Sequence, residues 1–257
     1  MTILEARSEH EAGNWIHDAA VPRRLILAWQ APDQFGERHR WAVGEIVNND
    51  GEITFRYFGP GSEFEALNPG RSYEALLALG FRGYPAFRGD RVHRDNVLAA
   101  FMRRLPPRSR ADFSKYKQHF RIHPTDQPSD FALLGLTEAK LPSDGFSIVN
   151  TLEDETGPSE LFLEVAGHRY YAAQLSFDLQ PGQTVEFIPE PDNPKDPNAV
   201  KVCVHGEPVG YINRLQASRF LEWIAEGRLA GSIERLNGSS ERPRVFLFVR
   251  LSSQASI

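Results

Sequence analysis

Side chains able to stack, to bind phosphate and to accept hydrogen bonds gather in two short stretches of the sequence. Arg169-Tyr170-Tyr171 places a cation beside two phenol rings, and the segment PDNPKDPN follows about twenty residues later. Either ring could stack on a base, or could fill the core face of a strand, because adjacent strand residues face opposite sides. The acidic residues around the second stretch could hold a metal, but the prolines and asparagines between them favour a turn. These acids are Glu190, Asp192 and Asp196.

The elements expected to position these side chains are strands and a tight loop. Turn-forming residues fill the segment before Ala199, and Ala199–Val204 then alternates apolar and polar at the period of a half-buried strand. Val209–Ile212 is predicted as the next strand, with Gly210 where the backbone approaches a neighbour or a ligand closely. Arg169–Leu175 is also predicted as a strand. In a closed barrel we expect the loop to lie against it.

This ordered set resembles the HIRAN domain, a small β-barrel module found alone in bacteria and fused to helicases in eukaryotes. The resemblance lies in Arg169-Tyr170-Tyr171, in the loop 191–196 followed by Asn198-Ala199-Val200-Lys201-Val202, and in Gly210-Tyr211-Ile212 before a helix. It implies capture of the 3′ end of single-stranded DNA, with bases on the two tyrosines and the terminal hydroxyl on Asp196. Lys195 stands where the eukaryotic relative has an aromatic residue. The predicted DNA-binding residues are Arg169, Tyr170, Tyr171, Asn193, Lys195, Asp196, Tyr211 and Arg214.

Composition limits the other possibilities. A chain of 257 residues, 41% hydrophobic and 25% charged, is long enough for two globular domains. Its net charge of -5 argues against a protein that coats nucleic acid by charge alone, so any nucleic-acid site must be local. The single cysteine, Cys203, excludes a disulfide within the chain and predicts a buried thiol in a reducing compartment. Without a membrane-spanning apolar run, we expect a cytoplasmic protein.

The predicted fold class is α+β, an N-terminal antiparallel sheet with helices followed by a small HIRAN-like β-barrel with a helix. Predicted boundaries are a leader at 1–21, domains at 22–150 and 160–257, and a linker at 151–159. In the first domain we expect strands at 24–29, 40–47 and 53–58, the last two joined by an Asp50-Gly51 hairpin turn, and helices at 73–79, 96–105 and 110–122. Ser72 is predicted to cap the first helix, and a capping box formed by Ser109 and Asp112 to open the third. In the second domain we expect strands at 161–165, 184–188, 229–236 and 244–251, a helix at 215–226, and a turn at Asn237-Gly238.

Residues 22–150 resemble the N-terminal subdomain of HipA-type toxin kinases. The shared segments are GFRGYPAF at 80–87, LPPRSR at 105–110 and FALLG at 131–135. In the family this subdomain packs on the kinase and contacts partners. No phosphate loop or catalytic loop of a kinase follows it here, so kinase activity is not expected. The resemblance implies an alternative role as an interaction subunit, an antitoxin-like partner of a separately encoded HipA-type kinase.

A basic, aromatic-rich stretch lies within the N-terminal segment, between residues 103 and 121. Its basic residues either converge on one phosphate-contacting face or form a solvated helical face paired with acids. They are Arg103, Arg104, Arg108, Arg110, Lys115, Lys117 and Arg121. His119 and His123 have the spacing of metal ligands on a helix, but without a third ligand no metal is expected. No hydrolase or metalloenzyme motif is found, which predicts a non-enzymatic binding protein without a cofactor.

Overall fold

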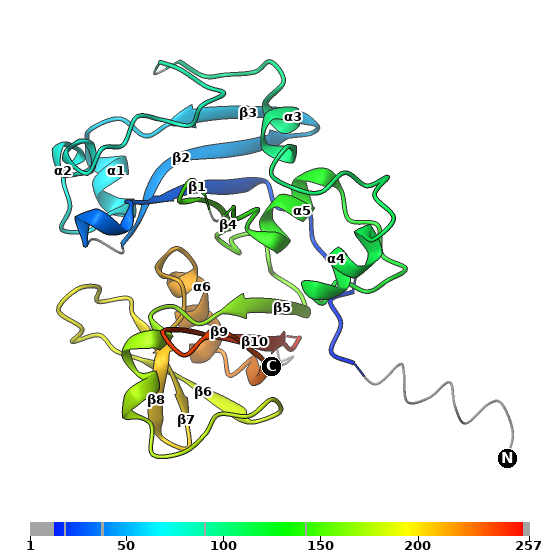
Figure 1. Ribbon diagram of the computed structural model, residues 1–257, viewed down its shortest axis with the longest axis vertical. Coiled ribbons are helices and arrows are strands. Elements are labelled where there is room, and N and C mark those ends of the chain that lie inside the picture. The colour runs from blue at the N-terminus through cyan, green and yellow to red at the C-terminus, as the bar shows by residue number, and fades with distance from the viewer. Residues whose placement is uncertain (1–12, 18, 37–38, 90, 142, 254–257) are drawn as a thin grey trace, which may run out of the picture.

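The structure is a computed structural model that describes residues 13–17, 19–36, 39–89, 91–141 and 143–253. Residues 1–12 of the predicted leader lie outside the described residues. Two antiparallel sheets, one from each half of the chain, lie one above the other, with a single long helix between them (Figure 1). The predicted fold class, α+β, is confirmed.

The N-terminal half is built on a four-stranded sheet. Its strands are β1 (Arg24–Gln30), β2 (Arg40–Asn49), β3 (Glu52–Tyr57) and β4 (Phe146–Asn150), in the order β3-β2-β1-β4. The predicted hairpin between β2 and β3 is confirmed, because Asp50 and Gly51 have φ values of 51° and 99°, as a type I′ turn requires. β4 was not predicted. It is a short, largely buried strand that pairs with β1 from a distant part of the sequence.

The described residues of this half also form five short helices: α1 (Ser62–Leu67), α2 (Tyr73–Ala78), α3 (Val97–Met102), α4 (Phe113–His119) and α5 (Asp130–Thr137). The predicted cap of α2 is confirmed, since the Ser72 hydroxyl accepts a hydrogen bond from the Ala75 amide at 3.2 Å. The predicted capping box of α4 is wrong. The Asp112 carboxylate binds the Arg110 guanidinium instead, and the helix begins only at Phe113. α1 and α5 were not predicted.

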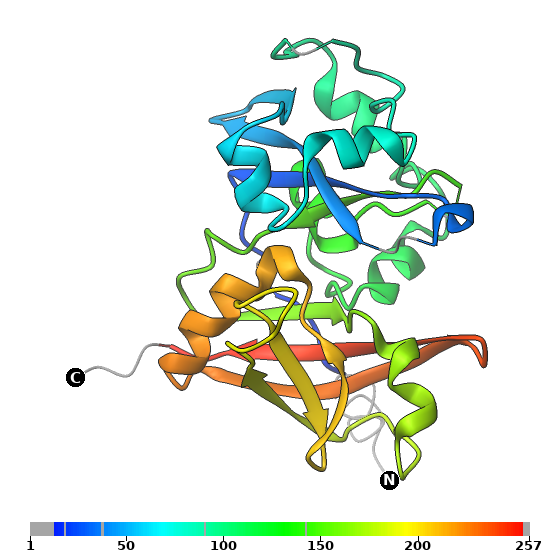
Figure 2. The same cartoon turned by 90° about the vertical axis from the view of Figure 1, so that its left-hand side faces the viewer.

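The C-terminal half is a curled six-stranded sheet. Its strands are β5 (Ser159–Glu164), β6 (Thr184–Pro189), β7 (Val200–Val204), β8 (Glu207–Tyr211), β9 (Leu229–Ser239) and β10 (Arg242–Leu251), in the order β5-β10-β9-β6-β7-β8. Helix α6 (Arg214–Ala225) buries Phe220 and Trp223 against this sheet. Figure 2 shows α6 on the side of the sheet that faces the N-terminal half.

Two predictions in this half are wrong. The segment Arg169–Leu175 forms the 3₁₀ turns η2 (His168–Tyr170) and η3 (Ala172–Gln174) instead of a strand. Gly167 has a φ of 73°, which turns the chain out of the extended conformation, and the Tyr170 amide then donates to the Gly167 carbonyl at 3.0 Å. The turn expected at Asn237-Gly238 lies beyond Ser239, because both residues stay paired with β10.

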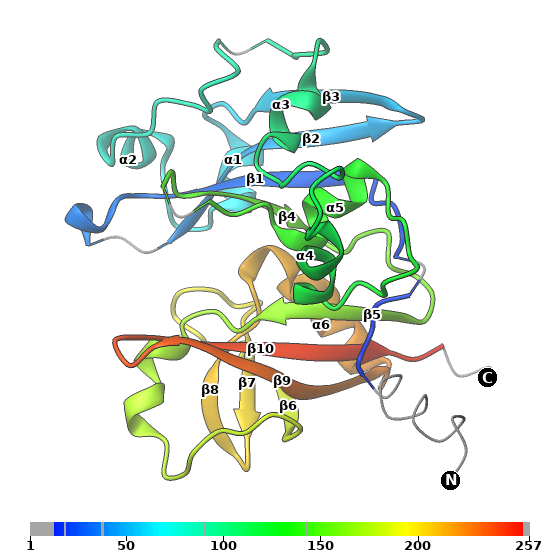
Figure 3. The ribbon, with the colours of Figure 1, turned by 45° about the vertical axis from the view of Figure 1, so that its right-hand side comes forward.

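The two halves are held together by an aromatic cluster and by polar contacts. Phe162 of β5 and Phe246 of β10 stack with their ring centroids 5.2 Å apart, and Ile16, Phe120 and Leu136 of the N-terminal half belong to the same apolar cluster. Burial of each such side chain contributes about 1.5–3 kcal/mol. Gln216 of α6 also donates to the Asn150 carbonyl of β4 at 2.9 Å. Residues 13–17 and 19–23 cross this seam before the chain enters β1 (Figure 3), and the His17 amide donates to the Glu160 carboxylate. None of the described helices is long and apolar enough to cross a membrane.

Candidate nucleic-acid interface

A hollow of about 910 Å³ opens at the seam between the two halves. We call it the seam pocket. Most of the residues predicted from the sequence to bind DNA line it, although one of the elements that carries them was assigned wrongly. They are Tyr170, Tyr171, Asn193, Lys195, Asp196, Tyr211 and Arg214. Arg169 lines a neighbouring hollow of about 370 Å³, which shares Tyr170 and Arg214 with the seam pocket.

The loop between β6 and β7 is closed by its own side chains. The Asn193 side-chain oxygen accepts from the Lys195 amide at 2.9 Å and from the Asp196 amide at 3.3 Å. One carboxylate oxygen of Asp196 accepts from the Asn198 amide at 2.9 Å. The prediction that these polar residues form a turn agrees with these bonds. The loop therefore presents Lys195 and Asp196 on a preformed backbone.

Glu190 fastens this loop to the strands beside it. Its carboxylate binds Lys201 Nζ at 2.6 Å, Asn193 Nδ2 at 2.6 Å and the Tyr211 hydroxyl at 2.8 Å. The bonds from Lys201, Asn193 and Tyr211 stabilise the charged form and lower the pKa of Glu190 to about 2. Partial burial and the hydrogen bonds with Tyr171 and Glu190 raise the pKa of Tyr211. The carboxylate thus fixes one wall of the seam pocket at neutral pH.

The aromatic side chains present ring surface to the seam pocket. Tyr170 is 57% exposed, and the Arg169 guanidinium lies 4.4 Å from its ring centroid. The Tyr171 and Tyr211 rings lie 6.0 Å apart at an angle of 60°. The alternative that one of the two adjacent tyrosines fills the core of a strand is wrong, because η2 is not a strand and neither ring is buried.

A close backbone approach holds η2 against β8. The Ala166 and Tyr211 backbones exchange hydrogen bonds of 2.7 and 2.9 Å, and the ring of buried His168 bonds to the Val209 carbonyl at 2.8 Å. Gly210 has a φ of 144°, and a Cβ there would lie 2.6 Å from the Ala166 carbonyl oxygen. The prediction that Gly210 allows a close approach is confirmed, and the neighbour is the segment that leads into the tyrosines.

Arg214 is the first residue of α6 and reaches across the seam. It donates to the Leu67 carbonyl and, at 3.4 Å, to the Arg40 carbonyl of the N-terminal half. Burial lowers the pKa of Arg214 to about 10, Asp196 opposes this shift, and the like charge of Arg71 adds to it. The positive end of the α6 dipole also lies at this position. The seam pocket therefore has an environment that favours an anion.

The predicted phosphate-contacting face of the basic stretch is wrong for two of its members. Arg104 is buried and donates to the Asp144 carboxylate and to the carbonyls of Ala139 and Phe146. Lys117 is also buried and donates to two loop carbonyls. Burial takes both cations out of reach of a phosphate.

The remaining basic residues divide into two groups. Those that form ion pairs, in agreement with the alternative of a face paired with acids, are Arg108 with Asp130, Arg110 with Asp112, and Arg121 with Glu234. Arg103 and Lys115 are exposed, and for them a phosphate contact stays a prediction.

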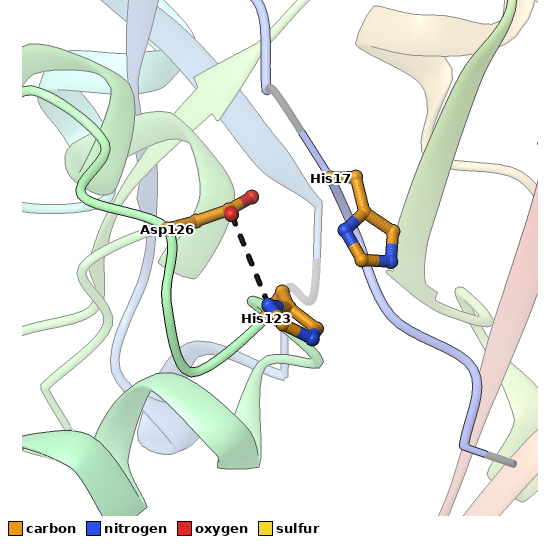
Figure 4. A group of neighbouring side chains, drawn as sticks. All are labelled: His17, His123 and Asp126. Carbon is orange, nitrogen blue, oxygen red and sulfur yellow. Dashed lines mark ion pairs between the residues drawn. The ribbon is translucent and has the colours of Figure 1, made fainter. Parts of the chain in front are cut away.

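The two histidines that were considered as a metal pair, His119 and His123, have different contact partners. Arg235 donates to the His119 carbonyl at 3.0 Å, whereas His123 lies beside His17 and Asp126 (Figure 4). Ligand atoms of these last three residues lie within 4.8 Å of one another. The His17 and His123 rings are tilted by 33° with their centroids 4.5 Å apart, and His123 Nδ1 bonds to Thr125 Oγ1 at 2.7 Å. The structure therefore brings two candidate ligands to His123 that the sequence did not indicate, but exposed groups of this kind are common without an ion, and we assign no metal here.

Residues of the N-terminal half form the opposite wall of the seam pocket. No sequence pattern marked them as functional; Pro69-Gly70 predicts only a turn. They are Gly36, His39, Pro69, Gly70 and Arg71.

Comparison with known proteins finds a family match for a segment of the C-terminal half. Residues 159–252 match the HIRAN domain family. Among solved structures, the HIRAN domain of human HLTF is 22% identical, over 37% of this chain and 77% of that one, with a TM-score of 0.32. A protein from Lactobacillus plantarum is 23% identical, over 37% of this chain and 99% of that one, with a TM-score of 0.28. No curated protein matches the chain. The family match confirms the HIRAN part of the resemblance, whereas the HipA-type resemblance of residues 22–150 stays a prediction.

Proposed function

We propose that the protein binds single-stranded DNA by one of its ends, with the 3′ end favoured, and that the seam pocket is the site. The observation that carries the proposal is the convergence of two tyrosines, a lysine and an aspartate from separate segments on one hollow. The match of residues 159–252 to the HIRAN domain supports a role in nucleic-acid binding.

Each side chain has a distinct role in this proposal. The exposed Tyr170 ring and the Tyr171 ring stack on bases, and each stacked base contributes about 1–3 kcal/mol. Lys195 and Arg169 contact phosphates. Asp196 accepts a hydrogen bond from the terminal hydroxyl, a charge-assisted contact that a phosphorylated end cannot make. Since only one Asp196 oxygen bonds to the Asn198 amide, the carboxylate retains capacity for this contact.

The proposed activity is binding without turnover. The chain carries a net charge of -5, so its affinity must come from a shaped pocket more than from a long basic groove. We therefore expect tight binding to depend on a free end.

The proposal is tested by a binding titration followed by fluorescence anisotropy. Single strands with a free 3′ hydroxyl, a 3′ phosphate or a blocked 5′ end are compared with blunt duplex. We expect the free 3′ hydroxyl to bind best. Tyr171→Ala is expected to weaken binding to strands with free and with phosphorylated 3′ ends by a similar factor, because stacking does not depend on the terminus.

Asp196→Ala is the variant that separates end capture from general strand binding. It should reduce the preference for a free 3′ hydroxyl while leaving affinity for the phosphorylated end unchanged or improved, because a negative charge is removed. Equal binding of free and blocked ends by the wild-type protein would overturn end capture. The role as an interaction subunit, with a HipA-type kinase as partner, would then become the leading proposal.

A further inference from the structure

The wall of the seam pocket that faces the tyrosines belongs to the N-terminal half, outside the segment that matches the HIRAN domain. Its centre is the loop between α1 and α2, which brings Pro69, Gly70 and Arg71 to the pocket. The matched segment begins only at residue 159, so the family resemblance assigns nothing to this wall.

This loop is fixed to the N-terminal sheet by one buried side chain. Asn68 is fully buried; its side chain accepts from the Ala42 amide at 2.9 Å and donates to the carbonyls of Ala42 and Phe64 at 3.0 and 2.9 Å. The Asn68 carbonyl then accepts from the Arg71 amide at 3.1 Å, which closes a turn in which Gly70 has a φ of 70°. The loop is therefore anchored at the residue that precedes the pocket lining.

Arg71 is positioned by an aromatic ring. Its guanidinium lies 5.4 Å from the centroid of Trp41, a buried residue of β2, and the side chain is half-buried. A cation held over an indole face keeps its charge and loses conformational freedom before any ligand arrives. Arg71 therefore meets a ligand in a prearranged position.

Several basic side chains lie close together in this part of the seam pocket. Burial, with the positive charges of Arg214 and Arg71, lowers the pKa of His39 to about 3, so the imidazole stays neutral at physiological pH. Among the residues that the structure describes, the basic side chains of Arg71, Lys195 and Arg214 line the pocket together with the acid Asp196. A phosphate placed between these cations would be attracted by each of them.

We propose that Arg71 binds a phosphate next to the captured strand end, so that the N-terminal and C-terminal halves form one binding site together. This inference rests on the function proposed above and adds a contact from outside the HIRAN segment. The base stacks on the tyrosines of one half while the adjacent phosphodiester meets the guanidinium of the other half. The strand then continues past Tyr170 and Arg214 into the neighbouring hollow, where Arg40 and Arg169 lie.

The test uses the full-length chain and the variant Arg71→Gln, which removes the charge and keeps most of the side-chain length. The matched control is Arg94→Gln, because Arg94 is an exposed arginine of the same half that pairs with Glu52 at 2.6 Å and does not line the seam pocket. Affinity for a fluorescein-labelled oligothymidylate with a free 3′ hydroxyl is measured over a series of salt concentrations. Thermal unfolding of each variant verifies that it is folded.

We expect Arg71→Gln to weaken binding about 10-fold, as for loss of a charge-assisted contact. The slope of log affinity against log salt should fall by about 0.7, the contribution of one phosphate on a single strand. Arg94→Gln should change neither quantity. A folded Arg71→Gln protein with wild-type affinity and slope, tested beside a Tyr171→Ala variant that is weakened, would overturn this inference and leave the proposed function intact. A wild-type protein that does not bind single strands would instead refute the proposed function itself.

Discussion

Replacement of Glu190 by glutamine should loosen the loop that forms one wall of the seam pocket. Glutamine keeps an acceptor for Tyr211 and Asn193, but it loses the ion pair with Lys201. The measurement is the free energy of unfolding by urea, followed by circular dichroism, at pH 7 and at pH 3.5. Glu186→Gln, on an exposed position of the same strand, is the matched control.

The expected loss of free energy of unfolding in Glu190→Gln follows from the pKa of Glu190. Its fall from the ordinary 4.5 to about 2 corresponds to about 3 kcal/mol of preference for the charged form in the folded state. The side chain is 27% exposed, so solvent screening reduces this figure, and we expect a loss of about 1–2 kcal/mol at pH 7. For a chain of this size such a loss lowers the melting temperature by about 2–8 °C.

The pH dependence has a definite sign. A carboxyl group with a depressed pKa stabilises the folded state above its unfolded pKa, and this stabilisation is lost as the pH falls from about 4.5 towards 2. The stability gap between wild-type and Glu190→Gln protein should therefore be largest at pH 7 and clearly smaller at pH 3.5. Equal stabilities at pH 7, or a gap that does not change with pH, would refute the role assigned to this carboxylate.

Two further substitutions test the packing around the site. Gly210→Ala should lower the free energy of unfolding by about 1–3 kcal/mol and lower the melting temperature, because its Cβ would meet the Ala166 carbonyl oxygen at 2.6 Å in a backbone conformation with a φ of 144°. The control is Gly157→Ala, which has open space around it and should leave the melting temperature unchanged. Equal melting temperatures for the two variants would count against the close approach. Arg104→Ala should lower the free energy of unfolding by about 3 kcal/mol, because it removes a buried guanidinium that binds Asp144 and two carbonyls. It should leave the salt dependence of DNA binding unchanged, and a lower salt slope in a folded Arg104→Ala protein would restore Arg104 as a phosphate contact.

Local signals in the sequence were sufficient where neighbouring residues decide the conformation. The Asp50-Gly51 turn and the Ser72 cap were predicted correctly, because each depends on residues within one turn of the chain. Asp112 failed as part of a cap, although it is equally local, because its carboxylate had a competing partner in Arg110.

Long-range contacts account for the larger errors. Arg169–Leu175 was predicted as a strand, yet Gly167 turns the chain, and the His168 ring bonds to the Val209 carbonyl, far along the chain. The HIRAN motif nevertheless placed the tyrosines and the loop at Asp196 in one site. The position of Arg71 in the lining of the seam pocket was not predictable, because it depends on how the two halves pack together.

Photo-crosslinking of a strand end to the protein tests the central claim most directly. A single strand with a photoreactive thymidine at its 3′ terminus is irradiated in complex with the full-length chain, and the crosslinked peptides are identified by mass spectrometry. The account predicts crosslinks to the lining of the seam pocket, at the tyrosines Tyr170 and Tyr171 or at the loop 193–196, and few crosslinks when the same nucleotide is placed at the 5′ end. Crosslinks that fall mainly on another surface, or that are equally frequent from both ends, would contradict it.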